Sequence, residues 1–240
     1  MKLLRLSTQL HKWIALVVGI QVLFWVAGGL VMTAIPIETV RSEHHLAPVT
    51  PKPLAFDGVL PVAEAASRAG VKPIEAQLRA TPRGPVWAFK PAKGEPVIVS
   101  AFTGARHPAM TPDEAQSFAR TAYQGKGRPV SVKLLPKAPE ETGKTGALWR
   151  IDFDDGERTS FYLSPETGEV VSRRSNVWRF YDFFWRLHIM DLEKGENFNH
   201  PLIVVATVLT LSIVITGFIL LWIKIARDLK SLPAGRRRGA

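Results

Sequence analysis

Cysteine is absent from this chain of 240 residues. Without thiols the chain cannot form disulfides, bind zinc or iron–sulfur clusters through cysteine, or attach haem through thioether bonds. Hydrolase and nucleotide-binding motifs are missing too, because the sequence has no HExxH, no phosphate-binding glycine loop and no serine framed as a nucleophile. We therefore expect no hydrolytic activity, and any cofactor must be held by side chains other than cysteine.

Positive charge is concentrated at the two ends of the chain. The formal net charge is +10, but the central region is close to balanced and has no basic stripe. A nucleic-acid partner is therefore not expected, whereas basic ends suit anionic lipid. The basic residues at the ends are Lys2, Arg5 and Lys12, and then Lys224, Arg227, Lys230, Arg236, Arg237 and Arg238.

Two long apolar runs, residues 13–37 and 201–223, contain no charged side chain. A membrane crossing needs about 20 apolar residues, and the first run is longer than the apolar core of about 7 to 15 residues in a signal peptide. We predict two transmembrane helices. The flanking basic residues place both termini, residues 1–12 and 224–240, in the cytoplasm, with the central region on the opposite side.

Small residues in the first run predict helix packing. Ala15 and Gly19 are four residues apart, and Gly28 and Gly29 follow. Such residues let a second helix or another copy of the chain approach closely, and Gln21 could form a hydrogen bond across that contact. Alternatively, the glycines are incidental.

The central region reads as a linker followed by a duplicated unit. Proline-rich residues 38–57 predict the linker, and residues 58–109 and 110–174 each show a helical pattern followed by strand-like runs. Thr111 and Glu114 form a capping-box pattern at the start of the second helix. Matching landmarks recur in the two copies, which predicts an α+β fold of two helix-and-sheet units: Trp87, Gly94 and Thr103-Gly104, then Trp149, Gly156 and Thr167-Gly168.

An acidic cluster surrounds Gly156. Asp152, Asp154, Asp155 and Glu157 lack the spacing of a calcium-binding loop. We predict instead that Asp155-Gly156 forms a tight hairpin turn, because this pair readily adopts the positive φ angles that such turns require.

An aromatic stretch, VWRFYDFFWRLHIMD, precedes the second apolar run. Its apolar residues follow helical spacing, but charged residues interrupt it too often for a membrane span. We predict a helix over residues 176–191 that lies at headgroup depth, where Trp and Tyr are favoured. The alternative is a buried amphipathic helix of the globular region.

Three segments carry a family resemblance. LHKWIALVVGIQ from Leu10, RFYDFFWRLHIMD from Arg179 and NFNHPL from Asn197 resemble the PepSY-associated transmembrane family, and the repeated helix-and-hairpin unit resembles PepSY domains. The resemblance implies an inner-membrane protein of a two-membrane bacterium with a periplasmic tandem PepSY-like domain. Members of this family include proteins tied to iron and siderophore uptake, and larger members with at least four spans are haem-containing ferric-siderophore reductases.

Histidines gather at the predicted membrane boundaries. Haem b needs two axial ligands, most often histidines on facing helices. His44 or His45 could pair with His188 or His200 on the outer side, whereas His11 on the inner side needs a homodimer or another membrane subunit. His11 and His188 are the strongest candidates because they lie in the family-like motifs. Alternatively, these histidines are polar tips at headgroup depth, and His44-His45 is a solvated turn.

Two functions therefore compete. In the first, the protein is a haem-binding electron-transfer component or accessory of ferric-siderophore reduction. In the second, it is a non-catalytic interaction module that binds or restrains a periplasmic protease or another partner protein, and its helices only anchor it.

Overall fold

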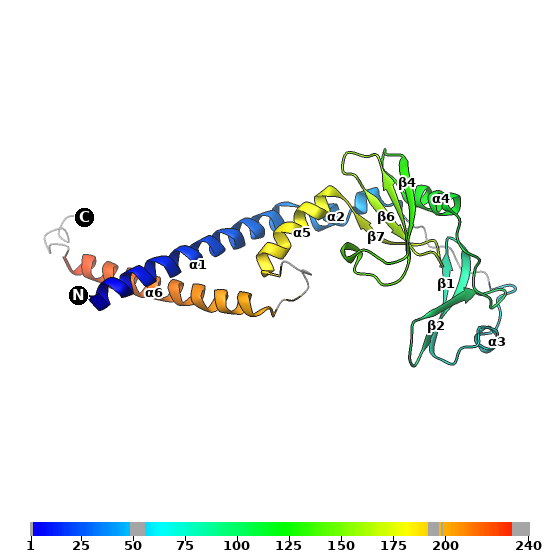
Figure 1. Cartoon of the computed structure of the whole chain (residues 1–240), viewed down its shortest axis with the longest axis horizontal. Coiled ribbons are helices and arrows are strands. Elements are labelled where there is room, and N and C mark those ends of the chain that lie inside the picture. Colours follow the sequence, from blue (N-terminus) through cyan, green and yellow to red (C-terminus); the bar gives the residue numbers. More distant parts are fainter. Residues whose placement is uncertain (1, 49–55, 192–196, 198, 232–240) are drawn as a thin grey trace, which may run out of the picture. The chain divides into compact units, whose positions relative to one another are not determined.

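The computed structural model describes residues 2–48, 56–191, 197 and 199–231. The chain divides into two compact units (Figure 1). We call Met1–Ala34 together with Asp182–Ala240 the helical unit, and Ile35–Tyr181 the sheet unit. The division falls inside one helix, α5 (Asn176–Ile189).

Two long helices, α1 (Lys2–Ala34) and α6 (Pro201–Ser231), dominate the helical unit and run side by side in opposite directions (Figure 1). Both are long and apolar enough to cross a membrane, over Ala15–Ala34 and Pro201–Leu229. α1 ends before the predicted boundary at residue 37 because Pro36 lacks an N–H group and disfavours helical geometry in the residue before it. α6 continues beyond residue 223 into its basic end.

The sheet unit begins with folded structure where a linker was expected. α2 (Ile37–Val40) and the 3₁₀ helix η1 (Glu43–His45) occupy the first part of residues 38–57. This segment forms backbone hydrogen bonds with the end of a later helix and the residues after it, since Ala47 N donates to Ala122 O at 2.8 Å and Gln124 N donates to His45 O at 2.8 Å. The linker prediction is therefore wrong for residues 38–47, and residues 49–55 lie outside the described chain.

The first helix-and-sheet repeat contains α3 (Val62–Arg68), β1 (Pro73–Thr81), β2 (Gly84–Pro91) and β3 (Val97–Ser100). The strands form an antiparallel meander in the order β1-β2-β3. Its core is small: Ala65 and Ala66 of α3 pack with Phe89 and Val99, which lie on the inner faces of β2 and β3. A core of this size is marginal alone, so the repeat depends on contacts with its neighbour.

The second repeat is larger, with α4 (Pro112–Ala122), β4 (Pro129–Leu135), β5 (Leu148–Phe153), β6 (Ser160–Leu163) and β7 (Val170–Arg174). A short 3₁₀ helix, η2 (Glu140–Thr142), lies between β4 and β5, and the antiparallel order is β4-β5-β6-β7. The capping box is confirmed, because Thr111 Oγ1 accepts from Glu114 N at 3.2 Å and Glu114 Oε2 accepts from Thr111 N at 2.8 Å. Ala115 and Ala119 pack on Ile151, Phe161 and Leu163.

The same turn occurs once in each repeat. Gly104 N donates to Ser100 O at 2.9 Å, and Gly168 N donates to Ser164 O at 2.9 Å. Both glycines have positive φ, 71° and 73°, which a residue with a side chain rarely adopts.

The two repeats also contact each other. Arg79 of β1 donates to both carboxylate oxygens of Glu169 at 2.8 and 2.9 Å. Arg83, in the β1–β2 turn, donates from its guanidinium to Pro165 O at 3.1 Å and from its backbone N to Thr167 O at 3.3 Å. The β1–β2 hairpin of the first repeat thus contacts the turn at Thr167-Gly168 in the second repeat.

The first turns of α5 are fixed to the second repeat through Glu141. Arg179 donates to the two carboxylate oxygens of Glu141 at 3.2 and 3.3 Å, and the hydroxyl of buried Tyr162 donates to one of them. Burial alone would raise the pKa of Glu141, but hydrogen bonds from Tyr162 and Arg179, with the charges of Arg179 and Arg150, outweigh it and lower that pKa. Burial, followed by the hydrogen bond to Glu141, raises the pKa of Tyr162.

Candidate functional site

Gly28 allows the end of α5 to lie against α1 within the helical unit. A Cβ atom placed at Gly28 would lie 3.2 Å from His188 Cβ and 3.3 Å from Phe184 O. Gly29 has no such neighbour, because a Cβ there would have nothing within 4 Å among the described residues. The predicted close approach of a helix therefore occurs at Gly28, and its partner is α5.

The imidazole of His188 is held by the backbone of α1. Its Nδ1 lies 3.2 Å from Trp25 O. A carbonyl oxygen only accepts hydrogen bonds, so Nδ1 carries the proton and donates it. A neutral imidazole with its proton on Nδ1 keeps a free lone pair on Nε2, which is the arrangement commonly found in histidines that ligate a metal.

The face of α1 that meets His188 also carries unpaired donors. Gln21, Trp25 and Gly28 are one helical turn apart, so they share a face. Gln21 Nε2 and Trp25 Nε1 are buried without a hydrogen-bond partner in the described chain, so the bond predicted for Gln21 is not seen there. An unsatisfied donor is costly in an apolar surrounding, which makes this face suited to an acceptor outside the described residues.

The other two histidines of the helical unit are His200 and His11. His200 caps α6, because Ile203 N and Val204 N donate to its carbonyl at 3.0 and 3.3 Å and Leu202 N donates to its Nδ1 at 3.3 Å. A neutral His200 in this geometry carries its proton on Nε2 and has no free lone pair for iron. His11 belongs to α1, and its side chain lies outside what the structure describes.

His44 and His45 meet two acidic residues of the β5–β6 loop. His44 Nε2 lies 3.2 Å from Glu157 Oε1, and His45 Nε2 lies 3.4 Å from Glu157 Oε2 and 3.8 Å from Asp155 Oδ2. One donor atom from each of His44, His45 and Glu157 falls within 4.8 Å of the other two. These histidines were predicted as haem ligands, and the structure gives them carboxylate neighbours in the sheet unit.

Asp155 lies beside this cluster and is held there by two hydrogen bonds. Its Oδ2 accepts from the Tyr123 hydroxyl at 2.8 Å and its Oδ1 accepts from Thr159 N at 2.9 Å. Burial would raise the pKa of Asp155, but hydrogen bonds from Thr159 and Tyr123 and the charge of His45 outweigh it and lower that pKa. Burial and the bond to Asp155 raise the pKa of Tyr123 to about 12. Tyr123 therefore stays a neutral donor that holds Asp155 in place.

Close packing also orients His45. Its ring stacks on Tyr123, with centroids 5.6 Å apart and planes at 17°. Gly125 lies against both rings, since a Cβ there would collide with the Tyr123 hydroxyl oxygen and would lie 2.7 Å from His45 Nδ1. Any larger residue at position 125 would force this cluster to move.

The predicted turn at Asp155-Gly156 occurs, because this pair lies in the loop of the β5–β6 hairpin and Arg158 N donates to Asp155 O at 3.1 Å. The loop, residues 154–159, is longer than a tight two-residue turn, and its positive φ falls at Arg158, at 51°, and not at the Asp-Gly pair. No local pattern indicates that Glu157 contacts the histidines, which lie more than a hundred residues earlier in the chain.

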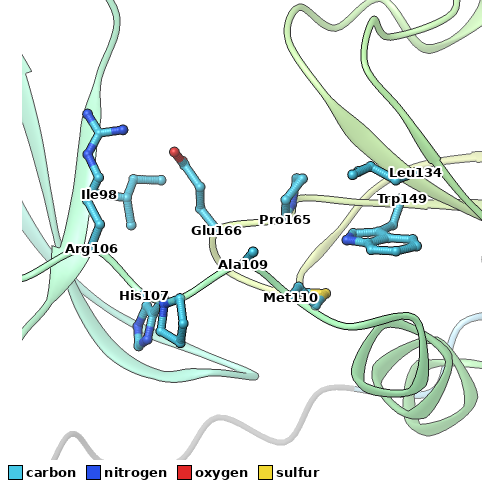
Figure 2. A pocket seen from close by; sticks show the side chains of 10 residues that line it. Ile98, Arg106, His107, Ala109, Met110, Leu134, Trp149, Pro165 and Glu166 are labelled. Atoms are coloured by element: carbon cyan, nitrogen blue, oxygen red, sulfur yellow. The ribbon is translucent and has the colours of Figure 1, made fainter.

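A small pocket lies between the sheets of the two repeats (Figure 2). It has a volume of about 210 Å³, below the range of about 300 to 1,000 Å³ usual for small-molecule sites. Ile98 faces it from the first repeat, and Leu134 and Trp149 face it from the second. His107 lies at its rim, where burial, followed by the charge of Arg83, lowers the pKa of the ring.

Comparisons with known proteins identify one family. No curated protein and no solved structure matches the chain. The family model described as the PepSY-associated TM region matches residues 8–240, which include both apolar helices, both repeats and α5. The chain belongs to the PepSY-associated transmembrane family.

Proposed function

We propose that this protein binds haem b and acts as an electron-transfer component or accessory of ferric-siderophore reduction in iron uptake. In this proposal it lies in the inner membrane of a two-membrane bacterium, with both termini cytoplasmic and the sheet unit periplasmic. The observation that carries the proposal is the contact between His188 Nδ1 and Trp25 O at 3.2 Å, which leaves Nε2 as a ligand. When bound, haem would supply one-electron redox chemistry.

The surroundings of His188 fit a ligand role. Gly28 brings α5 close enough for the backbone of α1 to fix the tautomer and the ring orientation. The unpaired donors Gln21 Nε2 and Trp25 Nε1 lie on the same face of α1, where they can serve the oxygen atoms of a bound cofactor or a polar group of a neighbouring subunit. The apolar side chains of both helices would limit access of water to the ligand.

His11 and His188 would serve different haem sites. Trp25, which contacts His188, lies about 21 Å along the α1 axis from His11 at a rise of roughly 1.5 Å per residue. Two axial ligands of one iron must lie within a few ångströms of each other, so these histidines cannot share it. A second copy of the chain or another membrane subunit would supply the missing ligands, since α6 exposes most of its apolar side chains in the single chain.

The test is an absorption spectrum of the purified protein in mild detergent, first oxidised and then reduced with dithionite. We expect a Soret band that shifts on reduction and sharp α and β bands. His188→Ala should lose the signal of its site, whereas His107→Ala, in the sheet unit, should keep the spectrum. A featureless spectrum from cells grown with ample haem would refute the proposal.

The pocket between the repeats favours a second candidate function, the binding of a partner protein. Its apolar wall includes Trp149 and the half-exposed Leu134, and its volume suits a side chain rather than a drug-sized ligand. Under this proposal the sheet unit binds or restrains a periplasmic protease or another protein. If deletion of residues 58–174 left activity in an iron-uptake assay unchanged, this candidate would be wrong.

A further inference from the structure

The cluster of His44, His45 and Glu157 holds buried polar atoms without hydrogen bonds. His45 is only 9% exposed, and neither of its ring nitrogens has a hydrogen-bond partner within the described ranges. Glu157 Oε2 is also buried and unpartnered, although it lies 3.4 Å from His45 Nε2. The two atoms are close but do not have the geometry of a hydrogen bond. Burying such groups costs free energy unless another atom satisfies them.

Two distances between the donor atoms are close to those around a tetrahedral metal ion. Zn²⁺ binds imidazole nitrogen and carboxylate oxygen at about 2.0 to 2.2 Å, so two ligands of one ion lie roughly 3.3 to 3.5 Å apart. Glu157 Oε1 lies 3.2 Å from His44 Nε2, and Glu157 Oε2 lies 3.4 Å from His45 Nε2. One ligand atom from each of the three residues lies within 4.8 Å of the other two, so one ion could bind all three after a shift of the side chains.

The surroundings of the cluster also fit an ion site. Asp155 Oδ2 lies 3.8 Å from His45 Nε2 but is already bonded to Tyr123, so we leave Asp155 out of the ligand set. The side chains of His44 and Glu157 are 42% and 30% exposed, which leaves an entry path. Two imidazoles with one carboxylate suit Zn²⁺ and similar transition-metal ions better than Ca²⁺ or Mg²⁺, which prefer oxygen ligands only.

We propose that His44, His45 and Glu157 bind one divalent transition-metal ion of the Zn²⁺ class, with water in the remaining position. The ion joins η1, which follows the first long helix in sequence, to the β5–β6 loop of the second repeat. It thereby adds an attachment to the backbone bonds of Ala47 and Gln124 that already hold this segment. The site is separate from the proposed haem ligand His188 and does not depend on it.

The test uses the full-length protein without a histidine tag, purified in mild detergent and stripped with a chelator. Equilibrium dialysis against ZnCl₂ should give one tightly bound Zn²⁺ per chain. Loss of supporting groups outside the ligand set commonly weakens metal binding about 10- to 100-fold. Glu157→Gln and His44→Ala remove ligands, so each should raise the Kd for Zn²⁺ by at least tenfold.

Matched controls separate this site from general effects. His107→Ala and Glu166→Gln alter a histidine and a glutamate elsewhere in the sheet unit, and both should keep the wild-type affinity. Glu157→Gln preserves side-chain shape, and an unchanged circular dichroism spectrum would show that it folds. Co²⁺ bound to the wild type should give the strong visible bands of tetrahedral coordination, and Glu157→Gln should lose them.

Two results would overturn the proposal: no stoichiometric Zn²⁺ binding by the wild type, or equal affinity in Glu157→Gln and the controls. The first would mean that the cluster is only an ionic contact between histidine and carboxylate. Haem spectra distinguish this test from that of the proposed function. Glu157→Gln should keep any haem signal, and His188→Ala should keep Zn²⁺ binding.

Discussion

Replacing Gly28 with leucine should separate α5 from α1. Two carbon atoms attract best at about 3.5 to 4.0 Å, but a Cβ at position 28 would lie 3.2 Å from His188 Cβ. Alanine alone would therefore require a shift of about 0.3 to 0.8 Å, and the further carbons of leucine would require more. Overpacking of this kind costs about 1 to 3 kcal/mol. This corresponds to a change of about 5- to 150-fold in the equilibrium between docked and undocked α5.

Reversible unfolding in mixed micelles of mild detergent and dodecyl sulfate measures this cost. Gly29→Leu is the matched control, because it adds the same side chain one residue later on α1 where a Cβ has no neighbour within 4 Å in the described chain. We expect the control to lie within about 0.5 kcal/mol of the wild type. If Gly28→Leu unfolded at the same dodecyl sulfate fraction as Gly29→Leu, the packing of α5 on α1 would be refuted.

Two further predictions use the same contacts and the Glu141 network. Because the chain has no cysteine, the double variant Gly28→Cys/His188→Cys should form an intramolecular disulfide on mild oxidation, visible as a mobility shift without reductant, and Gly29→Cys/His188→Cys should not. Tyr162→Phe removes a hydrogen bond to Glu141 and should lower the free energy of unfolding by about 1 to 3 kcal/mol in urea titrations at pH 7. Because the pKa of Glu141 is lowered in the folded state, its contribution to stability is present above the unfolded pKa and is lost as the pH falls through the folded pKa. Tyr162→Phe should therefore make the free energy of unfolding fall less steeply as the pH is lowered. An equally steep fall in the variant would contradict the role of this hydrogen bond in lowering the pKa of Glu141.

Local patterns were sufficient for the long helices, the start of α4 and the Thr-Gly turns of this fold. Long runs of residues without charge predicted α1 and α6. The capping box at Thr111 was predictable because its two partners are three residues apart. The Thr-Gly turns were visible because glycine occupies the position of positive φ in both repeats. These features depend on neighbours in sequence, so a single sequence contains their whole cause.

Features that depend on tertiary contacts were not predictable. The folded segment at η1 is stabilised by bonds to the end of α4, and nothing within residues 38–47 indicates that partner. Glu157 was recognised only as part of an acidic loop, since its meeting with His44 and His45 requires the whole second repeat to fold first. For His188 the sequence predicted a candidate ligand, but the tautomer follows from its contact with Trp25.

The bonds of η1 give the sheet unit a nested organisation. Its first segment attaches to the second repeat at two places, through Ala47 N, which donates to Ala122 O at 2.8 Å, and through Arg173 Nε, which donates to Arg41 O at 3.1 Å. The second repeat is therefore a discontinuous domain, and the first repeat is an insertion within it. Evolution or an engineer could exchange the inserted repeat as a cassette without disturbing the segments that lead to the long helices.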